Sequence, residues 1–69
     1  MDFQLRLEFI ELDNLLKTTK HAASGAEARQ HILAGSVKIN GQVETRIRRK
    51  LRSGDFVEFG NQQINIVGL

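Results

Sequence analysis

The side chains best suited to chemistry in this sequence are basic and lie close together in its second half. Arginine presents a planar fork of N–H donors that matches two phosphate oxygens, and lysine offers a compact positive charge. A dense group of them is typical of a phosphate-binding surface, but a solvated face can have the same composition. Five of the ten lysines and arginines fall between residues 46 and 52, called the basic segment below: Arg46, Arg48, Arg49, Lys50 and Arg52.

Charge is distributed unevenly along the chain, although its net value is only +2. Residues 1–35 contain four basic and five acidic side chains, a net charge of −1. Residues 36–69 contain six basic and three acidic side chains, a net charge of +3. Because a local positive patch attracts polyanions even on a nearly balanced protein, the distribution favours a polyanionic partner.

The sequence contains no pattern typical of catalysis or of cofactor binding. It has no cysteine, no glycine-rich phosphate loop, no serine elbow and no pair of carboxylates beside a histidine. His21 and His31 are ten residues apart and lack the further ligands that a metal site needs. We therefore expect a protein that is not an enzyme and that has no metal ion or other cofactor.

Length and hydropathy indicate one small domain in the cytoplasm. A chain of 69 residues has room for a single core. Residues 1–9 lack the basic start and the apolar run of a signal peptide. No stretch approaches the roughly 20 apolar residues that a membrane helix requires. We expect residues 1–69 to form one cytoplasmic domain without a membrane partner.

Hydrophobic periodicity predicts the elements that position the basic segment. Residues 3–9 alternate like a half-buried strand, with one face made of Phe3, Leu5, Leu7 and Phe9. Residues 11–20 predict a first helix, with an apolar stripe of Leu12, Leu15 and Leu16. A second helix is predicted over residues 24–35, because Ser24 and Glu27 have capping-box spacing and Gly35 is a typical stop. Its predicted buried face contains Ala28, Ile32 and Leu33.

Residues 36–47 predict a β-hairpin. Asn40 and Gly41 favour a type I′ turn, which needs positive φ at both central residues. The buried face of the predicted return strand contains Val43, Thr45 and Ile47. Its exposed face contains Glu44, Arg46 and Arg48. Two short strands follow, at residues 56–59 and 63–67. The expected fold is α+β, with two helices packed on a small, mostly antiparallel sheet of four to five strands.

The order and spacing of these features resemble the RNA-binding domain named after small-subunit ribosomal protein S-four, which contains the αL RNA-binding motif. That family has a Ser or Thr helix cap, then Ala and a basic residue, an apolar pair, Gly, and an apolar-x-apolar-Asn-Gly turn. A basic loop and a Gly-Asp turn follow. The matching residues are Ser24, Ala28, Arg29, Ile32, Leu33, Gly35, Val37, Ile39, Asn40, Gly41, Gly54 and Asp55. The resemblance spans roughly residues 11–59 and is closest to the small stand-alone bacterial members, called YbcJ-like.

Two positions depart from the family pattern. Many relatives have Arg directly after the capping residue, whereas this chain has Gly25, which removes one phosphate contact. The stand-alone members often have Gly within the basic loop, where this chain has Arg48 and so keeps the charge.

The resemblance implies that the second helix and the basic loop together face RNA. We expect Ile47 and Leu51 to anchor the basic segment in the core and to hold its cations on a fixed edge. The helix that starts after Ser24 offers free amides to a second phosphate, and Gly25 permits close approach. The predicted RNA-binding residues are Gly25, Arg29, Gln30, Lys38, Arg46, Arg48, Arg49, Lys50 and Arg52.

We expect a monomer. The resemblance implies that its partner is structured RNA, with ribosomal RNA as the first candidate. A ribosomal or assembly-factor protein is a second candidate partner. Two alternatives remain open: an adaptor whose basic face meets an acidic protein, and a non-specific nucleic-acid binder. The chain has no Trp or Tyr, and its four phenylalanines all fall in strand patterns that predict core positions. Because single-strand binders stack bases on exposed aromatic rings, we expect recognition of RNA shape with little base readout.

Overall fold

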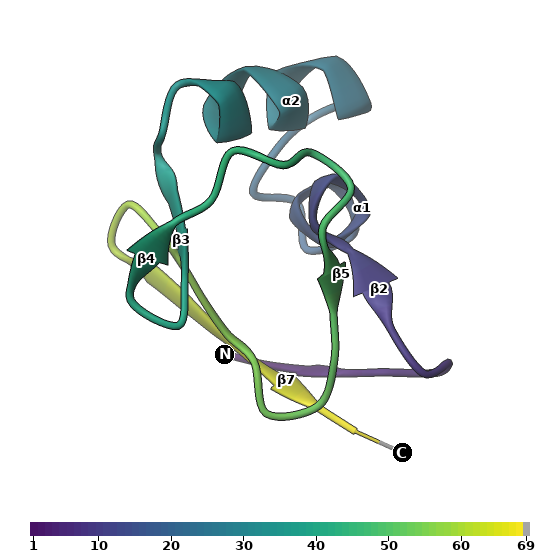
Figure 1. Cartoon of the computed structure of the whole chain (residues 1–69). Coiled ribbons are helices and arrows are strands. Elements are labelled where there is room, and N and C mark those ends of the chain that lie inside the picture. Colours follow the sequence, from purple (N-terminus) through teal and green to yellow (C-terminus); the bar gives the residue numbers. More distant parts are fainter. Residues whose placement is uncertain (69) are drawn as a thin grey trace.

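Two α-helices and seven short β-strands form in residues 1–68, the part of the chain that the computed structural model describes (Figure 1). In chain order they are β1 (Asp2–Gln4), β2 (Ile10–Glu11), α1 (Leu12–Thr18), α2 (Gly25–Leu33), β3 (Val37–Ile39), β4 (Gln42–Val43), β5 (Lys50–Leu51), β6 (Phe56–Phe59) and β7 (Gln62–Val67). This arrangement confirms the predicted α+β class. Neither of these helices has the length and apolar character that crossing a lipid bilayer requires.

The strands form two sheets of unequal size. The larger sheet has five strands in the order β1-β7-β6-β3-β4, and the smaller one pairs β2 with β5. Only the β1–β7 pair is parallel among the described strands, so the predicted, mostly antiparallel sheet is confirmed. In the small sheet Ile10 lies opposite Leu51, and Glu11 lies opposite Lys50. The small sheet therefore joins the start of α1 to the end of the basic segment.

An apolar core lies between the helices and one face of the larger sheet. Leu12, Leu15 and Leu16 of α1 are fully buried, which confirms the predicted stripe, and Ala28 and Ile32 of α2 are buried with them. The sheet contributes alternate residues, as the two-residue period of a strand requires. The remaining core residues are Leu5, Ala22, Val37, Ile39, Leu51, Val57, Ile64 and Ile66.

The β3–β4 turn forms as predicted and is tied to the strand beside it. Asn40 and Gly41 have φ values of 53° and 85°, the positive values of a type I′ turn. Asn40 Oδ1 accepts the backbone N–H of Phe56 at 2.9 Å, and Asn40 Nδ2 donates to Asp55 Oδ1 at 3.0 Å. The Asn and Asp of the family pattern thus connect the hairpin to the start of β6.

Helix α2 begins as predicted but buries a narrower face. The N–H of Glu27 donates to Ser24 Oγ at 3.2 Å, and Gly35 ends the helix with a φ of 78°. The Glu27 carboxylate lies 3.5 Å from His31 Nε2 on the next turn. The predicted burial of Leu33 is wrong, because 61% of this residue is exposed. It lies one position beyond Ile32, about 100° around the helix from the buried stripe.

The predicted strand over residues 3–9 is wrong beyond Gln4. Leu5 still donates its N–H to Val67 O, but residues 6–8 form a bend and Leu7 is 73% exposed. Strand β1 pairs only with β7, which ends at Val67. Since the chain then lacks a strand to pair with, it turns to reach β2.

The predicted return strand of the hairpin also ends early. Strand β4 stops at Val43, which is 56% exposed rather than buried. Glu44, predicted on the exposed face, is half-buried instead. Strand β4 is an edge whose single neighbour is β3, which begins at Val37. The N–H of Glu44 still donates to Val37 O at 2.9 Å, and the chain leaves the sheet after Glu44.

Candidate nucleic-acid interface

The basic segment begins in the loop that connects β4 to β5, continues through β5 and passes both helices (Figure 1). Ile47 packs against the core and Leu51 is fully buried, so both predicted anchors are confirmed. Between these anchors the segment also holds the start of α1. The N–H of Leu12 donates to Arg49 O at 2.9 Å, and the N–H of Asp13 donates to Ile47 O at 3.1 Å.

These backbone bonds explain how α1 begins without a side-chain cap. The first N–H groups of a helix have no partner within the helix and need one from elsewhere. Glu11, the N-cap residue, provides no side-chain hydrogen bond, and carbonyl groups of the basic segment take that role. The segment is therefore fixed by its two apolar anchors, by α1 and by the pairing of β5 with β2.

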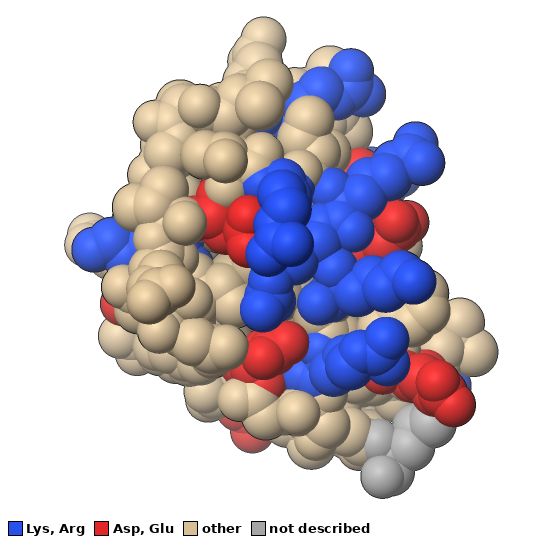
Figure 2. Space-filling model, in the orientation of Figure 1, with Lys and Arg blue, Asp and Glu red and all other residues tan. Residues whose placement is uncertain are grey.

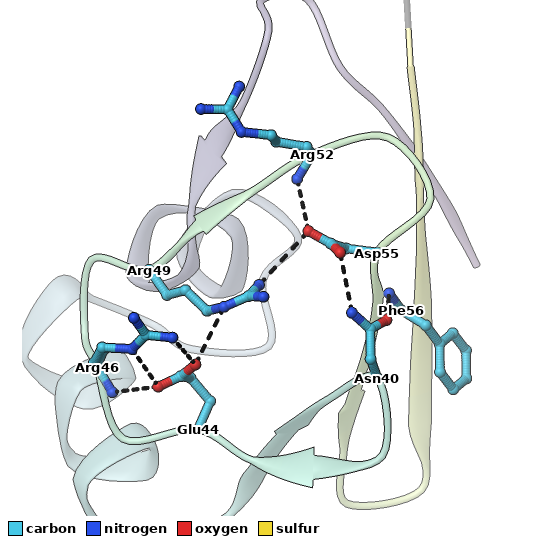
Figure 3. A network of polar contacts seen from close by, with 7 residues as sticks. All are labelled: Asn40, Glu44, Arg46, Arg49, Arg52, Asp55 and Phe56. Atoms are coloured by element: carbon cyan, nitrogen blue, oxygen red, sulfur yellow. Dashed lines mark hydrogen bonds and ion pairs between the residues drawn. The ribbon is translucent and has the colours of Figure 1, made fainter.

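Glu44 organises the first part of the segment. Its Oε2 accepts the backbone N–H and the Nε–H of Arg46, both at 3.0 Å, and its Oε1 accepts Arg46 Nη2 at 3.0 Å (Figure 3). Arg49 Nε lies 3.2 Å from the same Oε1. The side-chain hydrogen bonds from Arg46 are the main cause that lowers the pKa of Glu44 from 4.5 to about 2, against the opposing effect of burial. The same contact raises the pKa of Arg46.

Arg49 links Glu44 to Asp55. Its Nη1 lies 3.6 Å from Asp55 Oδ2, and only 24% of its side chain is exposed. Asp55 Oδ2 also accepts the backbone N–H of Arg52 at 2.9 Å, while its Oδ1 bonds Asn40 (Figure 3). Burial would raise the pKa of Asp55, but these hydrogen bonds and the charge of Arg49 outweigh it and hold the pKa below its usual value.

The cations of the segment therefore have different environments. Arg46 is held by Glu44 yet has a side chain that is 74% exposed, whereas Arg49 lies inside the network. Arg48, Lys50 and Arg52 are exposed and form no ion pair among residues 1–68. Figure 2 shows lysine and arginine side chains gathered on one face, with acidic groups between them.

Two shallow hollows connect the predicted residues. Arg46, Arg48, Arg49 and Lys50 line one hollow of about 560 Å³. Arg48 also lines a second hollow, of about 240 Å³, in which the N-terminal residue of α2, Gly25, is brought close to the segment. The rest of this hollow is of mixed charge, with Glu11, Asp13, Asn14 and Lys17. Arg48 is thus the residue that connects the basic segment to α2.

The structure places the other predicted residues less uniformly. Arg29 is exposed one turn after Gly25, on the same side of α2, and Gln30 is exposed one position further round the helix. Lys38 lies between the buried Val37 and Ile39, so its side chain projects from the opposite face of the sheet, across from Glu58. The structure therefore does not bring Lys38 to the hollows that Arg48 lines.

Two residues beside the segment were missed by the sequence analysis. In the sequence, Lys17 is recognisable only as a basic residue near the end of a helix. The tertiary fold brings it to the hollow that Arg48 lines. Phe9 was expected in the core, which is wrong. It is half-buried, with Lys50 Nζ 4.8 Å and Arg52 Cζ 5.5 Å from the centre of its ring. The strand pattern misled here because the chain bends before Phe9.

The sequence matches the family described as the S4 domain over residues 3–67. The chain belongs to this family. It is 41% identical over 58 residues to a protein of Escherichia coli (strain K12) named "Putative RNA-binding protein YbcJ", covering 84% of this chain and 83% of that protein. The YbcJ protein of Shigella flexneri matches with the same identity and coverage.

The fold of the S4-domain chain is also similar to a solved structure. The solution structure of YbcJ from E. coli matches with a TM-score of 0.72 and 39% identity, over 96% of this chain and 85% of that one. That structure is described as revealing an αL motif involved in RNA-binding. The predicted family and fold are therefore confirmed.

Proposed function

We propose that this S4-domain protein is a non-catalytic RNA-binding protein that docks structured RNA, with ribosomal RNA as the first candidate. The observation that carries the proposal is the set of exposed cations without ion pairs, Arg48, Lys50 and Arg52, on a loop fixed to the core. Cations that displace counterions from phosphates supply most of the affinity for a nucleic acid. Since the loop is held in place before binding, little freedom is lost on binding.

The contact residues divide by their geometry. Arg48 reaches the hollow that Gly25 lines, so one strand of phosphates can contact both the segment and the start of α2, with Arg29 one turn further. Arg46 presents an exposed fork whose orientation Glu44 sets. The contacts of Arg49 favour a supporting role, in which it holds Glu44 and Asp55 together below the binding face.

The names of the relatives support RNA as the polyanion. One similar protein has a name that includes RNA-binding, and the similar solution structure is described by an RNA-binding motif. An acidic protein partner or any nucleic acid would meet the same cations. The tests must therefore distinguish these occupants rather than only detect binding.

Ultraviolet crosslinking in living cells, followed by denaturing purification and sequencing of the attached RNA, tests the proposal directly. We expect reads concentrated on one structured region of ribosomal RNA. Reads on another structured RNA would support the same binding mechanism with a target other than ribosomal RNA. No RNA above a variant with Arg48→Gln, Lys50→Gln and Arg52→Gln would favour the protein adaptor.

A titration with matched variants tests the surface itself. Arg48→Gln with Lys50→Gln removes two charges from the segment, and Lys20→Gln with Lys38→Gln removes two exposed charges elsewhere. The first pair should weaken binding of an RNA duplex and reduce the slope of log affinity against log salt by about two. The second pair should change both far less. Equal effects of the two pairs would show that only net charge matters. The wild-type protein is also titrated with a DNA duplex, and an affinity equal to that for the RNA duplex would indicate a non-specific nucleic-acid binder.

A further inference from the structure

An apolar surface lies beside the second end of the basic segment. Leu7, in the bend after β1, is 73% exposed. It lines a groove of about 690 Å³ together with the apolar Phe3, Leu5, Phe9 and Ile10 and with the polar Gln4, Arg6, Glu11, Asn14 and Thr18. A smaller hollow of about 320 Å³ places Leu7 and Leu5 beside Arg52, and Glu8 also lines this hollow without forming an ion pair with Arg52. Leu7 is exposed, whereas Phe3, Phe9 and Ile10 are half-buried, so the fold leaves the apolar side of this groove partly uncovered. An uncovered apolar patch with polar residues around it is typical of a binding site.

Phe9 connects this groove to the cations. Its ring lines the groove, and both Lys50 and Arg52 place their charged groups within 6 Å of the ring centre, at 4.8 and 5.5 Å. Neither cation forms an ion pair among residues 1–68. The site therefore combines a flat apolar ring with two positive charges that lack a partner anion.

The chemistry of this combination matches a nucleotide better than an apolar peptide. A base is flat and stacks on an aromatic ring, and here it would take the place of a cation that now lies over the ring. The displaced Lys50 or Arg52 would then meet the phosphate next to that base, which supplies the anion that each of them lacks. The planar guanidinium of Arg52 can also stack on a base. An apolar segment of a protein would cover the same ring but would desolvate both cations without neutralising them, which is unfavourable.

We propose that the ring of Phe9 is a stacking platform for one unpaired RNA base, with Lys50 and Arg52 on the adjacent phosphates. This inference rests on the proposed RNA-binding function and adds a preferred substrate class, RNA that carries an unpaired base in a bulge, loop or end. Stacking tolerates every base because each has a π-face, so the platform selects unpaired nucleotides rather than a sequence. It adds one stacking contact to the expected recognition of RNA shape and keeps the expectation of little base readout.

Three RNA probes separate stacking from phosphate contact: a duplex with one bulged adenosine, the same duplex with an abasic ribose at the bulge, and the fully paired duplex. The protein variants are Phe9→Leu, which keeps an apolar side chain but removes the ring, and Phe9→Trp, which enlarges the ring. Phe56→Leu is the matched control, because Phe56 is also a half-buried phenylalanine. Its neighbour Val57 points into the core, so the side chain of Phe56 projects from the face of the sheet that lies away from the core. Circular dichroism of each variant checks the fold.

The wild-type protein should bind the bulged RNA about tenfold more tightly than the abasic one, a typical effect of one stacked base. Phe9→Leu should lose this tenfold on the bulged RNA alone and become insensitive to the abasic change. Phe9→Trp and Phe56→Leu should keep the preference. Should Phe9→Leu not fold, the comparison of bulged and abasic RNA with the wild-type protein decides the question.

Two results would overturn the inference while leaving the proposed function intact. In one, the wild-type protein binds RNA but does not distinguish the bulged adenosine from the abasic ribose. In the other, Phe9→Leu weakens binding of bulged and paired RNA equally, which would show that the ring only positions Lys50 and Arg52. Failure of the wild-type protein to bind any of the three RNAs would instead overturn the proposed function and the inference with it.

Discussion

At its first end the basic segment is enclosed by acidic groups, whereas at its second end Lys50 and Arg52 lie over an aromatic ring. Glu44 and Asp55 hold Arg49 between them, and Glu44 also binds Arg46 through three hydrogen bonds. The two cations at the other end have no ion pair among residues 1–68. The same residue types thus stabilise the loop in one place and remain available to a ligand in the other.

The difference lies in what surrounds each charge, because a buried cation must be paired and an exposed one need not be. Arg49 has a buried Nη1 without a hydrogen bond, 3.6 Å from Asp55 Oδ2. This arrangement favours structure over ligand binding at Arg49. A count of positive charges in the sequence cannot distinguish the two ends, and the variants below are designed to do so.

The largest effect should come from removing the apolar anchor of the second end. Leu51→Ala should lower the free energy of unfolding by about 2–5 kcal/mol, because Leu51, which lies between Lys50 and Arg52 in the chain, is fully buried. Denaturation by urea measures this change. Leu33→Ala is the control, and it should change stability by no more than about 0.5 kcal/mol because Leu33 is exposed. Equal stabilities would show that Leu51 does not anchor the segment.

Arg49→Gln should show that a paired cation of the segment contributes to stability, whereas its unpaired neighbour does not. The change leaves Glu44 and Asp55 without their shared cation and should cost about 1–3 kcal/mol of unfolding free energy. Arg48→Gln, next to it in the chain, should cost less than about 0.5 kcal/mol. Urea denaturation of both variants makes the comparison. An Arg49→Gln variant that keeps its stability but loses RNA binding would show that Arg49 contacts RNA directly.

Arg48→Gln should have the opposite effect to Arg49→Gln, because it should lower RNA affinity and leave stability nearly unchanged. We expect about a tenfold loss, equivalent to about 1.4 kcal/mol, because Arg48 is exposed and lines both hollows of the proposed interface. Lys38→Gln is the matched change on the other face of the sheet and should have a smaller effect. Titration of a structured RNA at constant salt compares them. A larger loss for Lys38→Gln would move the interface to the open face of the sheet.

The smallest effect should be the contribution of Glu44, at the first end of the segment, to the dependence of stability on pH. The folded-state pKa of Glu44 is lowered from 4.5 to about 2. A carboxylate with a depressed pKa stabilises the fold above its unfolded pKa and loses this contribution as the pH falls through its folded pKa. The wild-type protein should therefore lose more stability between about pH 4.5 and 2 than Glu44→Gln does.

That difference should stay below about 1 kcal/mol, because the partner Arg46 is 74% exposed and solvent screens the pair. Thermal unfolding followed by circular dichroism at several pH values measures it. Parallel pH dependences for the two proteins would show that Glu44 contributes nothing to the stability of the segment.

Local signals in the sequence were sufficient for the helices, the turns and the strand pairs near them. The leucine stripe of α1, the Ser24 cap and the Asn40–Gly41 turn all depend on neighbours a few residues away, and each is present. Predictions failed where an element depended on a partner distant in the chain. Strand β1 ends where β7 ends, and β4 ends opposite the start of its one neighbour, β3.

The candidate site divides in the same way. The sequence by itself determined which cations gather on one loop, and it determined the anchors Ile47 and Leu51, because an apolar residue among charged ones is held by the core. Only the tertiary structure decided which cations remain available. The pairing of Arg49 with Asp55, the approach of Arg48 to Gly25 and the meeting of Phe9 with Arg52 all join residues from different elements. Such contacts depend on how the elements pack against one another, and a pattern of neighbouring residues in the sequence does not predict that packing.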